Sequence, residues 1–260
     1  MANPSSYRFW ELRWNEIAAL DRDRTLIIQP TGAIEQHGHH LPIDTDIKNA
    51  SEMALRVAER AMRDGIGNVL VAPPIWWGTS PHHMAYPGTI SLKMSTMSDL
   101  LVDIVASFWK HRFYRILFLN GHGGNMGVLS ATAIRISEEV GISPAVVSYW
   151  QLVKDTLREV NDSPIGGLGH ACEMETSIQL HLRAERVDMS QAGPDMPRQL
   201  VTYSCTDFRE PGPVMIPGTS PATAAPVRWA IRRRRRPRRA GGSSTRRSST
   251  CWCWPATCWP

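Results

Sequence analysis

The feature that most constrains the fold is a regular alternation of short apolar runs with longer segments of helical periodicity. Four runs are typical of buried strands: Thr25–Gln29, Asn68–Ala72, Arg115–Leu119 and Ala145–Tyr149. Three amphipathic segments lie between or beside them: Asn49–Asp64, Met97–Trp109 and Met126–Glu139. Strands that alternate with helices of this length form βαβ units, whose strands pair in parallel. The sequence therefore predicts an α/β fold with a mostly parallel sheet.

The periodicity also predicts which helical side chains face the core. In the first segment these are Met53, Leu55, Val57, Ala58 and Met62. In the second segment they are Leu100, Leu101, Ile104, Val105 and Phe108. Neither an internal repeat nor an interior linker interrupts the pattern, so we expect a single domain over residues 1–222.

The net charge of +5 comes entirely from the C-terminal segment. Residues 223–260 hold ten arginines and no acidic residue. The other residues carry 19 basic against 24 acidic side chains, a net charge of about −5. A mildly acidic body gives no reason to expect nucleic acid as a partner.

The segment 223–260 also differs from the body in its other residues. It holds three of the five cysteines and four of the ten tryptophans, and it has no apolar periodicity. An Arg-Pro-Ser block followed by CWCWPATCWP is typical of off-frame translation of a GC-rich gene, so we interpret this tail as a frameshift product. A basic arm for nucleic acid or anionic lipid, and an ordinary solvated terminus, are the alternatives.

Neither a membrane nor a secretory route is indicated. No apolar run approaches the roughly 18 residues that span a bilayer. Residues 1–21 carry several charges and have no apolar signal core. Five irregularly spaced cysteines do not predict a disulfide framework. We expect a cytoplasmic protein without a membrane partner.

In parallel sheets the binding site lies beyond the carboxyl ends of the strands. The twelve residues 35–46, after the first strand, include Glu35, His37, His39, His40, Asp44 and Asp46. In an extended segment, Glu35 and His37 point to the same side. Carboxylate oxygens together with imidazole nitrogens favour Zn²⁺, Mn²⁺ or Fe²⁺ over Mg²⁺ or Ca²⁺. A loop that is histidine-rich by chance is the alternative, but three histidines within four positions favour a metal site.

Two further segments carry the same kind of chemistry. After the third strand, Asn120–Asn125 (NGHGGN) surrounds His122 with glycines, which let the backbone approach an ion or a substrate closely. Asn125 could cap the next helix. Residues 169–177 (GHACEMETS) open a helical stretch in which His170 and Glu175 can face one cavity. Each segment alone is equally compatible with a structural turn histidine and, for Glu175, a favourable first-turn acid.

Together, the stretches GAIEQHGHHLPIDTD, NGHGGN and HACEMETS resemble the creatininase (creatinine amidohydrolase) family. The resemblance covers about residues 12–216. It implies a three-layer α/β/α sandwich, two divalent metal ions per subunit and hydrolysis of amide-type C–N bonds. It also implies a homo-oligomer, commonly a hexamer.

The resemblance assigns roles to individual residues. Glu35, Asp46 and His122 correspond to the ligands of one metal. His37 and the bridging Asp46 correspond to ligands of the other metal. His170 corresponds to the acid–base group.

The sequence departs from creatinine-hydrolysing members in two places. Their Tyr-Glu after the central histidine is replaced by Gly123 and Gly124, and the glycine-bearing branch recruits the Glu of the ETS motif, which is Glu175 here. Their Trp-Asp pair before the acid–base histidine corresponds to Gly166 and Gly167. Because the aromatic clamp is missing, creatinine itself is not the expected substrate.

The loop 76–89 faces the substrate in the family. Ser80, His82 and His83, together with Gly123, are therefore candidate substrate-binding residues. The alternative is that Trp76 and Trp77 are core and that the histidines are merely exposed. A third metal on His82 and His83 is not expected, because no carboxylate lies nearby in the sequence.

The resemblance therefore implies a dinuclear metal-dependent hydrolase of a cyclic amide or formamide. The family's other branches include deformylases of formamidopyrimidine compounds, a peptidase of mycofactocin maturation and a hydrolase of a sugar lactone or cyclitol. Hydrolysis of a lactone or cyclitol on the same site is therefore one alternative. A catalytically inactive metal-binding relative is the other.

Overall fold

The computed structural model describes residues 4–193 and 207–213. Their centre is a four-stranded parallel sheet in the order β2-β1-β3-β4. The strands are β1 (Thr25–Thr31), β2 (Asn68–Val71), β3 (Ile116–Asn120) and β4 (Ala145–Ser148). In the register, Ile27 of β1 pairs with Leu70 on one side and Ile116 on the other. The predicted parallel sheet is confirmed.

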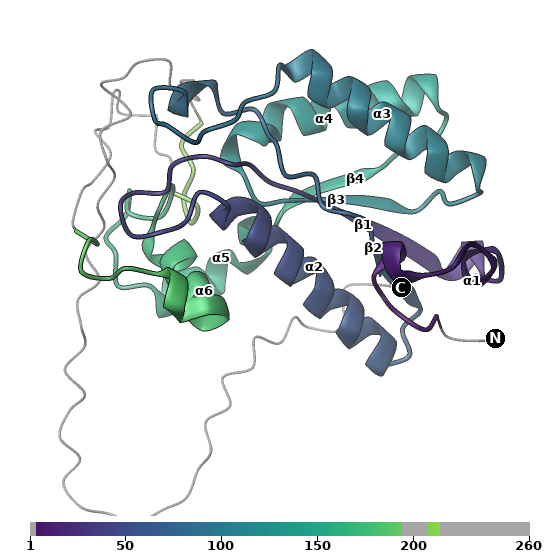
Figure 1. The fold of residues 1–260 in the computed structure, drawn as a ribbon, viewed down its shortest axis with the longest axis horizontal. Coiled ribbons are helices and arrows are strands. Elements are labelled where there is room, and N and C mark those ends of the chain that lie inside the picture. Colours follow the sequence, from purple (N-terminus) through teal and green to yellow (C-terminus); the bar gives the residue numbers. More distant parts are fainter. Residues whose placement is uncertain (1–3, 194–206, 214–260) are drawn as a thin grey trace, which may run out of the picture.

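Helices cover both faces of this sheet. They are α1 (Trp14–Ala18), α2 (Thr45–Arg63), α3 (Met94–Lys110), α4 (Met126–Glu139), α5 (Lys154–Val160) and α6 (Glu173–Arg183). The pair α3 and α4 lies on one face, whereas α2, α5 and α6 lie on the other (Figure 1). The predicted three-layer α/β/α sandwich is confirmed.

Each face has its own apolar core, because neighbouring residues of a strand point to opposite sides. Ile27 packs toward α3 and α4, in a cluster with Leu101 and Phe118. Its neighbour Ile28 packs toward α2, in a cluster with Ala58 and other side chains. Burying a large aliphatic or aromatic side chain contributes about 1.5–3 kcal/mol, so these two clusters hold the layers together.

Two details of the helices differ from the sequence prediction. Helix α2 begins at Thr45, four residues before the expected start, so Asp46 lies in its first turn. After its first turn, the apolar residues that α2 buries are alanines: Ala50, Ala54, Ala58 and Ala61. Met53, Leu55, Val57 and Met62 are only half-buried. The stripe of alanines lets the α2 backbone approach the sheet closely, which moves the larger side chains to its flanks. On α3, Leu100 is exposed rather than buried.

The described segment 207–213 supports the loop that precedes His170. The Asp207 carboxylate accepts hydrogen bonds from the backbone N–H groups of Gly166 and Leu168, at 2.8 and 3.1 Å. Arg209 donates to the carbonyl of Ser163 at 2.9 Å and to Asp207. The predicted tail 223–260 lies outside the described residues. Among the residues that are described, no helix is long and apolar enough to cross a membrane.

Candidate metal centre

The first two motifs lie side by side because β1 and β3 are neighbours. Thr31, the last residue of β1, is in register with Asn120, the last residue of β3. The Gly121 N–H donates to the Thr31 carbonyl at 2.8 Å. A Cβ at Gly121 would lie 2.4 Å from the carbonyl oxygen of Asp46. Glycine at this position therefore lets the end of β3 pass against the first turn of α2.

This arrangement brings four of the five predicted ligands into one buried cluster. The two oxygens of Asp46 face different histidines: Oδ1 lies 2.9 Å from His37 Nε2, and Oδ2 lies 2.9 Å from His122 Nδ1. Glu35 Oε1 lies 3.3 Å from the same His122 nitrogen. Asp46 is thus flanked on both oxygens by nitrogen atoms that could also bind a metal ion.

The hydrogen bonding of the two buried carboxylates is consistent with a bound metal ion. Among the described residues, Glu35 Oε2 is buried and accepts no hydrogen bond, and the buried Asp46 Oδ2 has the ion-pair contact with His122 at 2.9 Å but no hydrogen bond of good geometry. A buried carboxylate oxygen without a donor is costly unless a cation compensates it. One ligand atom each from Glu35, His37 and Asp46 lies within 4.8 Å of the others. Mixed imidazole and carboxylate donors at this spacing suit Zn²⁺, Mn²⁺ or Fe²⁺.

Glu175, the fifth predicted ligand, lies beside the cluster at a longer distance. It is buried in the first turn of α6, where its Oε2 accepts the Cys172 N–H at 3.1 Å. Its Oε1 lies 3.9 Å from His37 Nε2. Burial raises the pKa of Glu175 to about 7; the nearby His37 opposes this rise, and Asp46 adds to it by a smaller amount.

The electrostatics of the cluster favour positive charge. Burial alone would lower the pKa of His37, but the nearby Asp46 carboxylate raises it to about 10. Burial likewise opposes ionisation of Glu35, but His122 holds the pKa of Glu35 well below its usual range. Without a metal, the carboxylates attract protons onto these histidines. A divalent cation would compete for the same ligand atoms.

His170 and the loop 76–89 complete the surroundings of Glu35. His170 is partly exposed, and its Nδ1 lies 3.4 Å from Glu35 Oε1. His83 Nε2 lies 3.7 Å from the same oxygen, and the rings of His83 and His170 stack at 4.4 Å. Burial and the neighbouring His37 hold the pKa of His170 well below its usual range.

The other predicted substrate-binding residues lie near His122. The His82 ring is parallel to the His122 ring at 5.8 Å, and the buried Ser80 Oγ lies 3.3 Å from His122 Nε2. Trp76 and Trp77 are exposed, so the interpretation of these residues as core is wrong. The lack of a carboxylate near His82 and His83 in the sequence does not argue against a metal there, because the fold brings the Glu35 carboxylate to both.

Two histidines of the first motif lie outside the cluster. His39 is exposed, and His40 is buried with its Nε2 2.9 Å from the Thr176 hydroxyl. Asp44 pairs with Arg183 instead of joining the site. Of the three clustered histidines, only His37 therefore contributes to the candidate metal centre.

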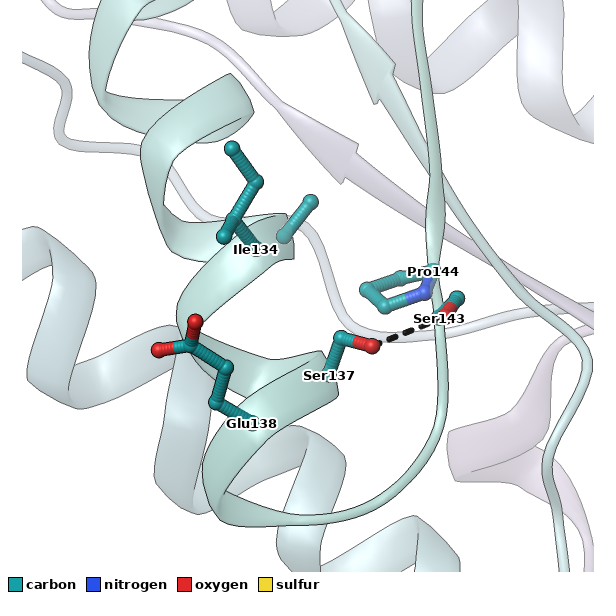
Figure 2. A pocket seen from close by; sticks show the side chains of 6 residues that line it. Ile134, Ser137, Glu138, Ser143 and Pro144 are labelled. Atoms are coloured by element: carbon teal, nitrogen blue, oxygen red, sulfur yellow. Dashed lines mark hydrogen bonds between the residues drawn. The ribbon is translucent and has the colours of Figure 1, made fainter.

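A hollow elsewhere on the surface is a poorer candidate. It lies between α4 and the segment before β4 (Figure 2). Its lining residues are Ala133, Ile134, Ser137, Glu138, Ser143 and Pro144. Glu138 is the only titratable group among them, so this hollow offers no set of metal ligands.

A family profile described as creatinine amidohydrolase matches residues 10–240. The chain belongs to the creatininase family. The matched range extends past residue 222. Creatininase-family proteins of known structure share the fold: a creatininase of the Zn–Zn type and a manganese creatininase each align with a TM-score of 0.69 at 28% identity. Each alignment covers 86% of this chain, with 88% and 89% of the respective creatininase.

Curated relatives in the family have different activities. Creatinine amidohydrolase of Pseudomonas putida is 31% identical over 225 residues, 80% of this chain and 84% of the relative. Mycofactocin precursor peptide peptidase of Mycolicibacterium smegmatis is 35% identical over 62% of this chain and 60% of the peptidase. The 3-dehydro-scyllo-inosose hydrolase of Thermotoga maritima is 30% identical over 71% of this chain and 59% of that enzyme. The alignments with the last two thus span about three fifths of each relative. The relatives are hydrolases, and this chain of the same family has a cluster of side chains that could hold a metal ion.

The two glycines that follow His122 lie in different surroundings. A Cβ at Gly124 would lie 2.4 Å from both His122 Nε2 and the Thr79 carbonyl oxygen. This backbone therefore has no room for the Glu that the resemblance places there in creatinine-hydrolysing members. A Cβ at Gly123 would meet nothing within 4 Å, so the space beside this residue is open.

Sequence reasoning missed two amide side chains at the site. Asn125 does not cap α4; its amide donates to the Gly32 carbonyl at 2.9 Å and accepts the Thr79 N–H at 3.0 Å. It thereby joins the three loops of the site. Gln36 contacts both His83 and His170. Its position between Glu35 and His37 was the only available signal, and it did not reveal these partners.

Proposed function

We propose that the chain is a dinuclear metal-dependent hydrolase that cleaves an amide-type C–N bond in a small cyclic amide or formamide. The main support for two ions is the position of Asp46, because each of its oxygens lies 2.9 Å from a different buried histidine. One ion would be held by Glu35, Asp46 and His122. The other would be held by His37, Asp46 and Glu175.

Two divalent ions, Zn²⁺, Mn²⁺ or Fe²⁺, would polarise a substrate carbonyl and lower the pKa of a water molecule. The chain's own residues would donate a proton and bind the substrate. The partly exposed His170 would donate a proton to the departing nitrogen, the role of a general acid. Ser80, His82, His83 and Gly123 would bind the substrate from the loops above the ligands.

The substrate class follows from the residues and the relatives together. The resemblance places the Trp-Asp pair of creatinine-hydrolysing members at Gly166 and Gly167, so creatinine is disfavoured. The named relatives act on a peptide, on creatinine and on an inosose. The last of these makes a lactone or cyclitol derivative the second candidate substrate. An inactive metal-binding relative is the remaining alternative.

The proposal extends to the setting of the protein. The active form would be a homo-oligomer in the cytoplasm. The family resemblance indicates a hexamer. Its partner would be a small-molecule substrate, with no nucleic acid and no membrane.

The test is a substrate screen on protein loaded with Zn²⁺ or Mn²⁺. Cyclic amides, formamides and lactones are incubated with the enzyme, and released amine, formate or hydroxy acid is measured. We expect turnover of an amide or formamide that chelator abolishes and that Asp46→Ala lacks. Turnover of lactones alone supports the second candidate. Two bound equivalents of metal without any turnover support the inactive relative.

A further inference from the structure

Gln36 lies between two proposed ligands in the sequence, but its side chain contacts the two histidines beside Glu35. The Gln36 Oε1 accepts the Gly38 N–H at 2.9 Å. This bond fixes the orientation of the amide, so the Nε2 end faces the imidazoles. Gln36 Nε2 lies 3.1 Å from His83 Nδ1 and 2.9 Å from His170 Nε2.

These contacts determine which ring nitrogens carry protons. An amide NH₂ group has two hydrogens to donate and does not accept. Each ring nitrogen that faces it must therefore offer a lone pair. A neutral imidazole then carries its proton on the other nitrogen, which is Nε2 in His83 and Nδ1 in His170. Those two atoms are the ones that face Glu35 Oε1, at 3.7 and 3.4 Å.

We propose that Gln36 is a positioning residue that holds His83 and His170 in these two tautomers and aims both N–H groups at Glu35. The stacking of the two rings, with centroids 4.4 Å apart and planes 25° apart, lets one amide reach both. Gly38 has a φ of +68°, a left-handed conformation that favours glycine and returns its N–H to Gln36.

The consequences for the reaction rest on the proposed function. Neighbouring groups that orient a metal-binding carboxylate tune its affinity, and their loss typically weakens metal binding about 10–100-fold. Gln36 would therefore strengthen metal binding without touching the metal. The tautomers themselves require neither metal nor substrate.

Two substitutions at Gln36 separate this role from simple packing. Gln36→Leu removes the donor, whereas Gln36→Glu keeps the shape and replaces the donor with an acceptor. Gln29→Leu is the matched control, because Gln29 is a buried amide that donates to the Pro73 carbonyl at 2.7 Å and contacts no histidine. Circular dichroism and thermal unfolding establish that each variant folds.

The primary measurement is the tautomer of each histidine, read by ¹⁵N NMR of imidazole-labelled, metal-free protein, with signals assigned from single His→Gln variants. We expect His170 protonated on Nδ1 and His83 on Nε2 in the natural chain. Gln36→Leu should give a mixture for at least one of them, and Gln36→Glu should move the His170 proton to Nε2. Gln29→Leu should change neither. A natural chain with His170 protonated on Nε2, or unchanged tautomers in Gln36→Leu, would overturn the proposal.

The second measurement is the zinc affinity, from competition with a chromogenic chelator. We expect Gln36→Leu to weaken zinc binding about 10–100-fold and Gln29→Leu to preserve it. Altered tautomers with an unchanged zinc affinity would overturn the link to Glu35. If no substrate is ever turned over, the proposed function fails while the tautomer result stands, so the two failures are distinguishable.

Discussion

His122 Nδ1 lies 2.9 Å from Asp46 Oδ2, although 76 positions separate the two residues in the sequence. Asp46 reaches this position from the first turn of α2, where the partial positive charge of the helix N-terminus stabilises a carboxylate. His122 reaches it from the turn after β3. The contact joins the first two motifs into one site.

Asp46→Ala should cause the largest loss of metal of any single substitution. It removes the one carboxylate that lies between His37 and His122, and it leaves the charges of both ions less compensated. Metal analysis after dialysis should find less than one equivalent. Asp44→Asn is the matched control, because Asp44 pairs with Arg183 outside the cluster. Two full equivalents in Asp46→Ala would disprove the bridging role.

His170→Ala should keep its metal and lose activity. His170 contacts Glu35 but lies at the exposed edge of the cluster, as expected for a group that acts on the substrate. The rate should fall about 10²–10⁴-fold, the usual range for general acid–base catalysis. His181→Ala, an exposed histidine of α6, is the control. Loss of metal in His170→Ala would make His170 a ligand and pass the proton-donating role to another group.

His40 should make the metal-free protein sensitive to acid. Burial lowers the pKa of His40 from 6.5 to about 4, with a further contribution from His37. Because the folded pKa is the lower one, His40 contributes stability above pH 6.5, and this contribution is lost as the pH falls toward 4. Urea unfolding across this range should show a shallower pH dependence in His40→Gln than in the natural chain, with His39→Gln as the exposed control. Equal slopes in all three proteins would contradict this role.

Arg209→Met should destabilise the fold without emptying the metal site. The substitution leaves the Asp207 carboxylate and the Ser163 carbonyl without their charged donor. We expect a loss of about 1–3 kcal/mol in the free energy of unfolding. Arg135→Met removes exposed ion pairs with Asp99 and Glu139 and should cost less than about 1 kcal/mol. Equal losses in the two variants would show that the Arg209 contacts have no special weight.

Truncation at about Pro221 should leave the metal content unchanged. All proposed ligands lie at or before Glu175, and the three cysteines of the tail lack paired zinc-site spacing. An added amphipathic C-terminal helix should raise the melting temperature. If truncation abolishes metal binding, residues after 221 belong to the working protein and the frameshift interpretation is wrong.

Much of the fold and the positions of the proposed ligands could be predicted from local patterns. Strands and helices have characteristic periods, so the βαβ alternation was visible without any tertiary information. The sites of parallel sheets lie after their strands, so the motifs that contain Glu35 and His122 could be placed at one edge. Gly124 also carried a signal, since its lack of a side chain marked a departure within the family.

The tertiary structure alone decided which side chains meet. Of the predicted inward face of α2, Ala58 is fully buried, whereas Met53, Leu55 and Val57 pack against the core only partly buried. Periodicity cannot distinguish an alanine stripe that packs closely from the larger residues beside it. Gln36 lies 134 positions from His170, and Asp207 lies 41 positions from Gly166. Hydrogen bonds over such separations leave no local pattern, because each partner keeps its own backbone period. Such contacts exist only once the sheet and its helices have fixed where the loops end.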